Sequence, residues 1–464
     1  MADPVLAGNP KHAEDEKESK SLDSMMTGSS PEEGQVINQK DAGEDVFGDE
    51  KDAGIKYKTN SWLETAFVMV AETVSLGILS LPSTLKAVGL VPGVLLLVGL
   101  GILATYTGYV IGQFKLRYPQ VHTFAEAGGV IAGRWGHELF ATGQLLFLVF
   151  IMGAHILSFS IMMNVLTEHA TCTIWFTVLG FGISLICTIP RTVKAMTYLS
   201  YLSTVSVLAA VFICMIGVGI ADADVHLRMV NSGIALYQGF GAVTNIIFAY
   251  AGHVAFFTLF SEMKDPREFH KALYTLQITD TLVYTVTAVV IYVYTGDNVR
   301  SPALGSASPL LAKIAYGIAL PTIVIAGVIN GHVAVKYIFL RICNRETISS
   351  NSWRSWGIWI AILSVLWVIA WVIASAIPVF NNLLGLISAL FLSWFTYGAS
   401  GVLWIFMNKG QLWTTKKQAF LTVLNGAVIP LGVSIMALGL YSSIEAIKRD
   451  TSGLIFSCAD NSLI

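Results

Sequence analysis

The chain alternates long apolar stretches with short polar connectors from Ser61 almost to its last residue. A membrane-spanning helix requires about 20 mostly apolar residues, and eleven stretches satisfy that requirement. They cover residues 62–86, 88–113, 137–166, 172–190, 198–220, 240–261, 272–295, 308–338, 355–379, 382–407 and 418–443. Turn-forming and charged residues such as Pro119, Asp222 and Asp265 separate them. The pattern predicts an all-α integral membrane protein with 11 transmembrane helices.

Lysine and arginine are unevenly divided between alternate connectors, and positively charged connectors favour the cytosolic side. With the N-terminus placed in the cytosol, the cytosolic connectors after the first span hold fifteen such residues and the outer side holds six. The outer six are Lys86, Arg228, Arg300, Lys313, Lys448 and Arg449. The bias predicts a multi-pass protein with a cytosolic N-terminus and an extracellular C-terminus.

Composition supports a membrane protein and excludes other classes. The 464 residues are 54% hydrophobic and only 12% charged, whereas a soluble domain carries about 25% charged residues on its hydrated surface. Mean hydropathy is +0.66. The formal net charge of −2 also argues against nucleic acid as a partner, because nucleic-acid-binding proteins carry a basic excess.

Residues 1–58 differ from the rest of the chain, with 14 acidic residues and 7 lysines. Such a segment buries too little apolar surface to offset its chain entropy, so we expect a disordered cytosolic tail. It has no apolar core near Met1 and is not a secretory signal. Its serines and lysines are candidate sites for kinases and ubiquitin. The predicted organisation is this tail, a transmembrane domain at 59–443, and a short extracellular tail at 444–464.

The five cysteines contain no CxxC pair, so neither a metal site nor a disulfide scaffold is indicated. Cys172 and Cys458 both fall on the outer side in the predicted topology. There they either pair with each other or remain free, because their separation in sequence says nothing about their distance.

Several membrane-protein classes lack their signatures in this sequence. Eleven spans exclude a seven-helix receptor, and the chain has no arginine ladder of a voltage sensor and no TVGYG-like filter. It also has no HExxH and no GxxxxGK[ST] motif. We therefore expect a secondary transporter, not an enzyme, that uses no cofactor and draws on an ion gradient. Discontinuous helices in two matching halves are the signature of that class.

The first span contains such an interruption, in the run Ser75-Leu76-Gly77-Ile78-Leu79-Ser80-Leu81-Pro82. Gly77 lowers the cost of leaving helical geometry, and Pro82 suits the first turn of a restarted helix. Backbone groups freed at the membrane midplane must line a cavity, because hydrocarbon cannot satisfy them. The alternative is a kinked helix that serves packing alone.

The sixth span has a similar centre, Phe248-Ala249-Tyr250-Ala251-Gly252-His253, which mixes glycine with polar groups at mid-depth. Two interrupted helices five spans apart fit a five-plus-five inverted repeat, with one extra helix at the C-terminal end.

The run from Tyr57 through Pro82, the segment FAYAGH at 248–253 and the segment SEMKDPREFHKAL at 261–273 resemble the amino acid/auxin permease family. The similarity is strongest to the Mtr-type neutral amino acid permeases of filamentous fungi and covers about residues 57–443. It implies a LeuT-type fold and proton-driven uptake of neutral amino acids across the plasma membrane. Many relatives carry Asn in the first span where this chain has Ala71 and Glu72.

A neutral amino acid presents a carboxylate, an ammonium group and an uncharged side chain. The N–H groups of the half-helix that restarts after Gly77 suit the carboxylate. The carbonyls at Phe248 and Ala249 suit the ammonium group. Leu148, Met152 and Ile156 share one helix face at i, i+4 spacing, and with Phe248 and Tyr250 they predict a pocket for apolar or aromatic substrates. The candidate substrate-binding residues are Thr73, Ser75, Leu76, Gly77, Ile78, Leu148, Met152, Phe248, Ala249 and Tyr250. Ordinary helix packing is the alternative for Leu148 and Met152.

Ionisable groups inside membrane helices are costly and usually functional. His253 is the first candidate for proton coupling, because it lies in the broken sixth span and histidine titrates near physiological pH; its alternative is a neutral histidine that hydrogen-bonds across helices. Glu72, one turn before the first break, is the second candidate, and its alternative is to bond the backbone amides freed at the break. Asp280 in the seventh span is the third, and an interhelical partner is its alternative. For His155 and His332 we expect a packing role.

Two alternatives remain to proton symport. Sodium coupling requires oxygens on the eighth span, where Thr322 lies near the outer end and Asn330 is the deeper candidate. A transporter-like nutrient sensor would share every span and both breaks, although the N-terminal tail is short for a signalling domain. The expected partners are therefore a neutral amino acid, a proton and the lipid bilayer.

Overall fold

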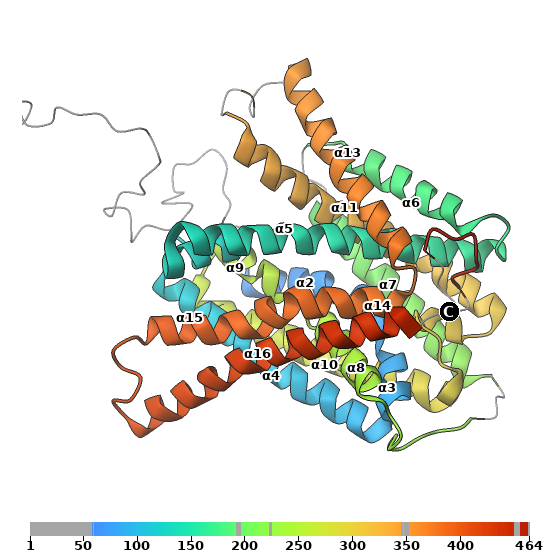
Figure 1. Ribbon diagram of the computed structural model, residues 1–464, viewed down its shortest axis with the longest axis horizontal. Helices are drawn as coiled ribbons and strands as arrows, with labels where there is room; N and C mark the ends of the chain where they lie inside the picture. The colour runs from blue at the N-terminus through green and yellow to red at the C-terminus, as the bar shows by residue number, and fades with distance from the viewer. Residues whose placement is uncertain are drawn as a thin grey trace, which may run out of the picture. The chain divides into compact units, whose positions relative to one another are not determined.

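The computed structural model describes residues 58, 60–191, 196–221, 225–344, 347, 352–449 and 455–462. The described chain is helical almost throughout (Figure 1). Of the predicted cytosolic tail, only Lys58 belongs to the described residues, and the candidate regulatory sites lie outside them.

Within the described residues, nine helical segments are long and apolar enough to cross a membrane, and one bent pair of helices makes a tenth. The nine are α4 (Leu90–Arg117), α5 (Phe124–Thr167), α7 (Met196–Gly219), α8 with α9 (Leu236–Ala249 and His253–Ser261), α10 (Phe269–Thr295), α11 (Pro309–Ile342), α13 (Trp353–Ala376), α14 with η7 and α15 (Phe380–Ile387, Ser388–Gly398 and Ala399–Met407) and α16 (Lys416–Arg449). The predicted fourth span corresponds to α6 (Thr173–Thr188), which is apolar but has only 16 residues.

The bent pair is the predicted first span. Helix α2 (Trp62–Thr73) ends at the break, a short 3₁₀ turn η3 (Gly77–Leu79) follows, and α3 (Leu81–Val88) continues at an angle of 47°. Ser61 caps α2 by accepting from the N–H of Glu64, whose carboxylate accepts from the N–H of Ser61. Pro82 stands in the first turn of α3, where its missing N–H has no intrahelical partner to lose.

The sixth span is interrupted between Ala249, where α8 ends, and His253, where α9 begins. The end of α9 is tied to the start of α2 by two backbone hydrogen bonds. The Asn60 N–H donates to the Glu262 carbonyl at 3.2 Å, and the Lys264 N–H donates to the Asn60 carbonyl at 2.9 Å. The two interrupted helices therefore share one end of the bundle.

Three helices depart from the predicted boundaries. Helix α5 begins at Phe124 rather than near 137, because an extra helical segment joins it across a kink at Ala132 and Gly133, where Gly133 has φ of 59°. Helix α16 continues to Arg449 rather than ending at 443. The tenth span contains an 11-residue π-helix, η7, which apolar patterning does not predict.

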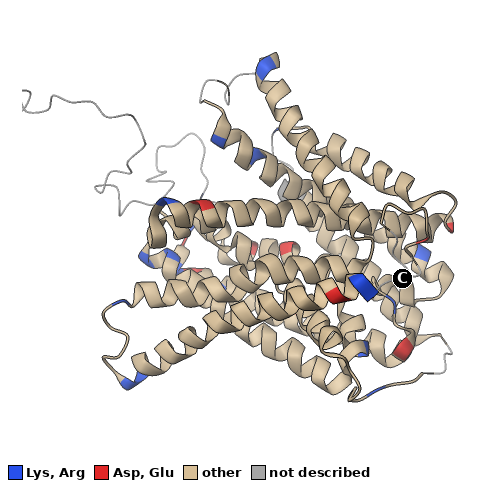
Figure 2. Cartoon of the chain, viewed as in Figure 1, with Lys and Arg blue, Asp and Glu red and all other residues tan. Residues whose placement is uncertain are grey.

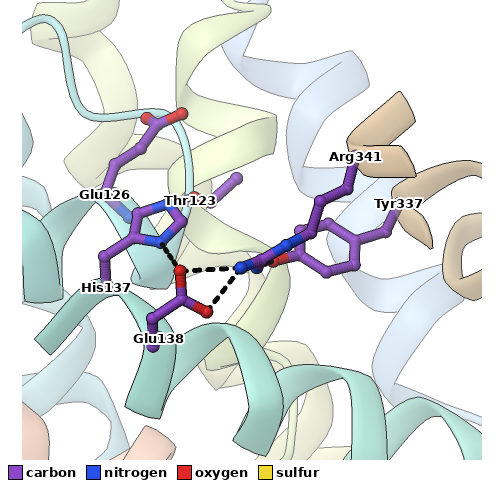
Figure 3. A network of polar contacts seen from close by, with 6 residues as sticks. All are labelled: Thr123, Glu126, His137, Glu138, Tyr337 and Arg341. Carbon is purple, nitrogen blue, oxygen red and sulfur yellow. Dashed lines mark hydrogen bonds and ion pairs between the residues drawn. The ribbon is translucent and has the colours of Figure 1, made fainter. Parts of the chain in front are cut away.

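Helices α5 and α11 are joined at both ends by ion pairs and near the middle by a hydrogen bond. At one end, the Arg341 guanidinium donates to both oxygens of Glu138 at 2.6 and 2.7 Å (Figure 3). At the other end, Lys313 Nζ lies 2.5 Å from Glu168 Oε1. Between them, His155 Nδ1 donates to the Ile323 carbonyl at 2.9 Å. These contacts hold α5 and α11 as one unit.

A disulfide joins Cys172, at the start of α6, to Cys458, with the two Cα atoms 4.3 Å apart. The segment around Cys458 packs on the ends of α5, α6 and α13. Asn461 is buried there and bonds Asn164 and Ser160 of α5 at 2.7 and 2.9 Å. Of the two alternatives for these cysteines, the structure contains the disulfide. Cys187, Cys214 and Cys343 are free thiols.

Charged residues lie mostly at the ends of the helices, and uncharged residues make up most of their length (Figure 2). Among the described residues, no group of three or more His, Cys, Asp and Glu side chains is arranged to hold a metal ion.

Candidate functional site

A cavity of about 230 Å³ lies where the two interrupted helices meet. Its lining comes from α2, the break after α2, α5, α7, α8, α9 and α11. It reaches Val68, Ser200 and Leu259, which lie toward the end of the bundle where α2 begins and α9 ends. The cavity therefore extends from the two breaks toward that end only, as judged from the described residues. We call it the central cavity.

The two breaks are in direct contact behind this cavity. A Cβ atom added to Gly77 would lie 2.6 Å from the Cα atom of Ala249, closer than real Cβ contacts allow. A Cβ atom added to Gly252 would likewise lie 2.6 Å from Cγ2 of Thr73. Glycine is thus required at position 77, where the opposing atoms belong to the backbone, whereas at position 252 the Thr73 side chain would have to shift.

The first break presents unused hydrogen-bond donors. The N–H groups of Leu76, Gly77 and Ile78 donate to no other described residue, since only the later groups of the turn close 3₁₀ bonds. The Ser75 hydroxyl is buried and has no hydrogen-bond partner among the described residues. Ser75, Leu76 and Gly77 line the central cavity, and Ile78 is fully buried beside them. Unpaired donors at the start of a helical turn are a site for an anion such as a carboxylate.

The expected ammonium-binding carbonyls of the second break are already engaged. The Ala249 carbonyl accepts from the Tyr284 hydroxyl at 2.9 Å, and the Phe248 carbonyl accepts from the Ala251 N–H at 3.2 Å. Phe248 lines the central cavity, whereas Ala249 and Tyr250 are buried and do not. The Tyr250 hydroxyl instead points to the Leu97 carbonyl and Thr281.

The wall supplied by α5 differs from the predicted one. Leu148 lines the central cavity, but Met152 and Ile156 are buried elsewhere. The lining residues of α5 are Gln144, Phe147, Leu148, Ile151 and His155. A helix has 3.6 residues per turn, so repeated steps of four drift around it, while alternating steps of four and three stay on one face. Sequence inspection missed Gln144, Phe147 and Ile151 because it used steps of four.

Glu72 is the acidic group of the described cavity lining, and its side chain is exposed within the cavity. His155 is the other ionisable lining group, with its Nδ1 bonded to the Ile323 carbonyl. Thr73 also lines the cavity, and its hydroxyl donates to carbonyls of its own helix. An acid exposed to a cavity inside the helix bundle is available to a proton or to the cationic group of a ligand.

His253 lies outside the central cavity and is fully buried against α4. Its Nε2 is 2.9 Å from the Ala104 carbonyl and 3.1 Å from Thr107 Oγ1. Its Nδ1 is 3.3 Å from the Tyr250 carbonyl. A neutral ring with its proton on Nδ1 donates to the Tyr250 carbonyl and accepts from the Thr107 hydroxyl at Nε2, whereas a doubly protonated ring donates to both carbonyls.

Asp280 of α10 is fully buried behind the two breaks. Its polar neighbours are the Thr73 hydroxyl and the rings of Tyr250 and Tyr284. Neither of its carboxyl oxygens forms a hydrogen bond of normal geometry with a described residue. Asp280 therefore contacts the site from the protein side rather than from the cavity.

Helix α11 contributes few side-chain oxygen atoms to the cavity lining. The Thr322 hydroxyl donates to the Ser203 carbonyl, and Asn330 lines the cavity with its amide nitrogen bonded to the Ala326 carbonyl. His332 is buried elsewhere, with Nε2 on the Pro190 carbonyl at 3.0 Å. Ser200, Ser203 and Thr258 also line the cavity, and no sequence signal distinguished them from packing residues.

The family model for transmembrane amino acid transporter proteins matches residues 58–445. A similar protein is the N amino acid transport system protein of Neurospora crassa, 36% identical over 87% of this chain and 89% of its own length. A transmembrane transporter of Gibberella moniliformis is 30% identical over 100% of this chain and 99% of its own length. Amino acid transporter AVT1H of Arabidopsis thaliana is 25% identical over 54% of this chain and 58% of its own length.

Solved transporter structures share the fold at low sequence identity. The structure of MhsT in complex with L-phenylalanine matches with a TM-score of 0.50 and 14% identity over 85% of this chain and 100% of that chain. A mutant of the manganese transporter of Eremococcus coleocola matches with a TM-score of 0.52 and 12% identity over 84% of this chain and 88% of that chain. These neighbours support the expected LeuT-like arrangement of helices. The relatives are transporters rather than enzymes, and the chain belongs to the family of transmembrane amino acid transporter proteins.

Proposed function

We propose that this protein is a proton symporter that imports neutral amino acids, with apolar or aromatic side chains preferred, across the plasma membrane. The observation that carries the proposal is the set of unused donors at the first break. The N–H groups of Leu76, Gly77 and Ile78 and the Ser75 hydroxyl lie beside a cavity whose described lining contains no Lys or Arg. An amino acid carboxylate is the natural acceptor for these groups.

The rest of the cavity fits the remainder of such a substrate. Phe147, Leu148, Ile151 and Phe248 provide an apolar wall for its side chain. Because the Ala249 carbonyl is bonded to Tyr284, we place the ammonium group nearer the end of α2, where Glu72 is exposed. In this arrangement Glu72 neutralises the ammonium group and the N–H groups of the first break bind the carboxylate, so no basic residue is needed.

Protons are favoured over sodium as the coupling ion for two reasons. The Thr322 hydroxyl is engaged by Ser203, so α11 offers the cavity only the Asn330 side-chain oxygen for a sodium ion. Sodium requires several oxygen ligands, whereas a proton requires one titratable group. His253 is our first candidate for that group, because it lies at the second break and its two ring nitrogens face the Ala104 and Tyr250 carbonyls. Glu72 and Asp280 remain the other candidates.

We further propose an 11-span topology in which α6 is the fourth, short span. In this scheme the chain is a five-plus-five inverted repeat followed by α16, with the N-terminus in the cytosol. The Cys172–Cys458 disulfide supports the orientation, because disulfides persist in oxidising compartments and would place the C-terminal segment outside. The central cavity then opens toward the cytosol.

Uptake of radiolabelled amino acids by permease-deficient cells that express the protein tests the proposal. We expect saturable accumulation of labelled L-phenylalanine or L-leucine that rises at acidic external pH, collapses with a protonophore and is indifferent to replacement of sodium by choline. Binding without net flux would instead indicate a nutrient sensor, and loss of uptake in choline would indicate sodium coupling. Competition by a panel of unlabelled amino acids then defines the preferred side chain.

A further inference from the structure

The described part of the C-terminal tail, residues 455–462, lies across one end of α5, α6 and α13. Its covalent attachment is the disulfide from Cys458 to Cys172 at the start of α6. Beside the disulfide, the Thr173 hydroxyl donates to the Ala459 carbonyl at 2.6 Å. Because α6 begins without a side-chain cap of its own, this segment supplies an attachment at the end of a short helix. We call residues 455–462 the C-terminal strap.

The strap is also bonded to α5 and packed on α13. Asn461 is 5% exposed, its Nδ2 donates to Ser160 Oγ at 2.9 Å, and its Oδ1 accepts from Asn164 Nδ2 at 2.7 Å. On the other side, the Phe456 ring packs edge to face on Trp371 of α13, with the ring centroids 5.7 Å apart. The strap therefore joins α5 to α13 as well as to α6.

The joined helices form one wall of the central cavity. Ile151 and His155 of α5 line the cavity, and Gly153 between them faces α13. A Cβ atom added to Gly153 would lie 3.0 Å from the Ala370 carbonyl oxygen, so α5 and α13 touch at this level. Trp371, which contacts the strap, is the next residue of α13. The strap thus holds α13 where α13 supports the cavity wall from behind.

The disulfide is accessible to small thiols, because Cys458 is exposed and Cys172 is half-buried. A thiolate that attacks Cys458 Sγ breaks the S–S bond, and Cys172 Sγ leaves as a thiolate and takes up a proton. A second thiolate then displaces Cys458 from the mixed disulfide, so the protein gains two thiols and the reductant is oxidised to its own disulfide. After reduction, a few neutral hydrogen bonds remain to offset the chain entropy lost by ordering the strap. Reduction should therefore release the strap.

We propose that the C-terminal strap is a thiol-sensitive support of the substrate site. With the disulfide intact, the strap holds α6 and α13 on α5 and keeps the cavity wall in place. Reduction by an extracellular thiol of low molecular weight releases the strap and weakens substrate binding. The inference rests on the proposed function for the substrate and on the proposed topology for access from outside. No strap residue belongs to the described cavity lining, so the effect on binding passes through the packed helices.

Equilibrium binding of radiolabelled L-phenylalanine to the purified full-length protein in lipid nanodiscs, before and after treatment with dithiothreitol, tests the inference. Dithiothreitol carries out both exchange steps, and labelling with a maleimide verifies that two new thiols appear. We expect reduction to raise the Kd about fivefold, the lower end of the range for coupling between separate sites. Reoxidation should restore the original Kd.

An unchanged Kd for the reduced protein would overturn the inference, as would a disulfide that dithiothreitol does not reduce in the folded protein. Absence of binding to the oxidised protein would instead refute the proposed substrate, and the inference with it. Cys458→Ser should have the higher Kd with and without dithiothreitol. A Kd of this variant that still responds to dithiothreitol would contradict the assignment to the strap.

Asn461→Ala keeps the disulfide but removes both side-chain bonds to α5, and we expect it to raise the Kd about twofold. Ser457→Ala is the matched control, because the Ser457 hydroxyl bonds the Ala459 N–H within the strap. Binding is measured well below the Tm of each variant. A lower Tm with an unchanged Kd in Asn461→Ala would show that the strap stabilises the fold without supporting the site, and would contradict the proposal.

Discussion

Gly77 of the first break lies directly against Ala249 of the second, so closely that no side chain fits between them. The contact places the unused N–H groups of the first break beside the end of α8. It also explains why the two interruptions form one site although five spans separate them. Glycine is needed here for close approach of two backbones, in addition to the flexibility that the sequence suggested.

Substitution of Gly77 should abolish uptake. A Cβ atom would meet backbone atoms of Ala249, which cannot rotate away, so even Gly77→Ala should reduce uptake about tenfold or more, and Gly77→Val should eliminate it. Uptake is measured together with surface biotinylation. Gly182→Ala is the control, because a Cβ atom there meets no other atom within 4 Å. Normal uptake by surface-expressed Gly77→Val would refute the assignment.

Removal of the Ser75 hydroxyl should weaken substrate binding. A hydrogen bond to a charged group contributes about 1.5–3 kcal/mol, so Ser75→Ala should raise the KM for uptake about 10- to 100-fold. Ser184→Ala, which changes a buried hydroxyl on α6 away from the cavity, should leave the KM unchanged. Equal KM values for both variants would show that Ser75 does not contact the substrate.

Replacement of His253 should uncouple uptake from the proton gradient. Gln retains hydrogen-bonding capacity but does not titrate, so His253→Gln should lose the dependence of uptake on external pH. Exchange of external for internal substrate requires no net proton movement and should persist. Glu72→Gln is the parallel variant. If only Glu72→Gln removes the pH dependence, the proton site belongs to the cavity and not to the buried ring.

The contact between Glu168 and Lys313 should stabilise the protein at neutral pH and lose that effect in acid. Hydrogen bonding and the charge of Lys313 lower the pKa of Glu168 below its ordinary value. An acid with a lowered pKa stabilises the folded state above its unfolded pKa, and the contribution disappears as the pH falls through the folded pKa. Glu168→Gln should therefore have a slightly lower Tm than the wild type at neutral pH, and the two values should converge as the pH falls through the lowered pKa of Glu168. A Tm difference that is constant over this range would contradict the ion pair.

The apolar pattern by itself determined which segments become membrane helices and where two of them are interrupted. Burial of backbone polar groups in hydrocarbon is so unfavourable that a run of about 20 apolar residues has few alternatives to a helix. Gly77 and Gly252, with Pro82, marked the interruptions, because these residues alter helix geometry locally. Apolar runs and helix-breaking residues act on their neighbours in sequence, so their effects can be predicted without knowledge of the tertiary structure.

Packing between distant segments decided the rest. Gln144 and Ile151 of α5 line the cavity because of the way α5 is rotated about its axis where it packs against α11. A small error in the assumed rotation selects Met152 in their place. Tyr284 could not be assigned to the Ala249 carbonyl from sequence, because 35 positions separate them. Likewise, only the folded chain distinguishes Glu72, exposed in the cavity, from the buried His253 and Asp280, since burial depends on every element packed around a side chain.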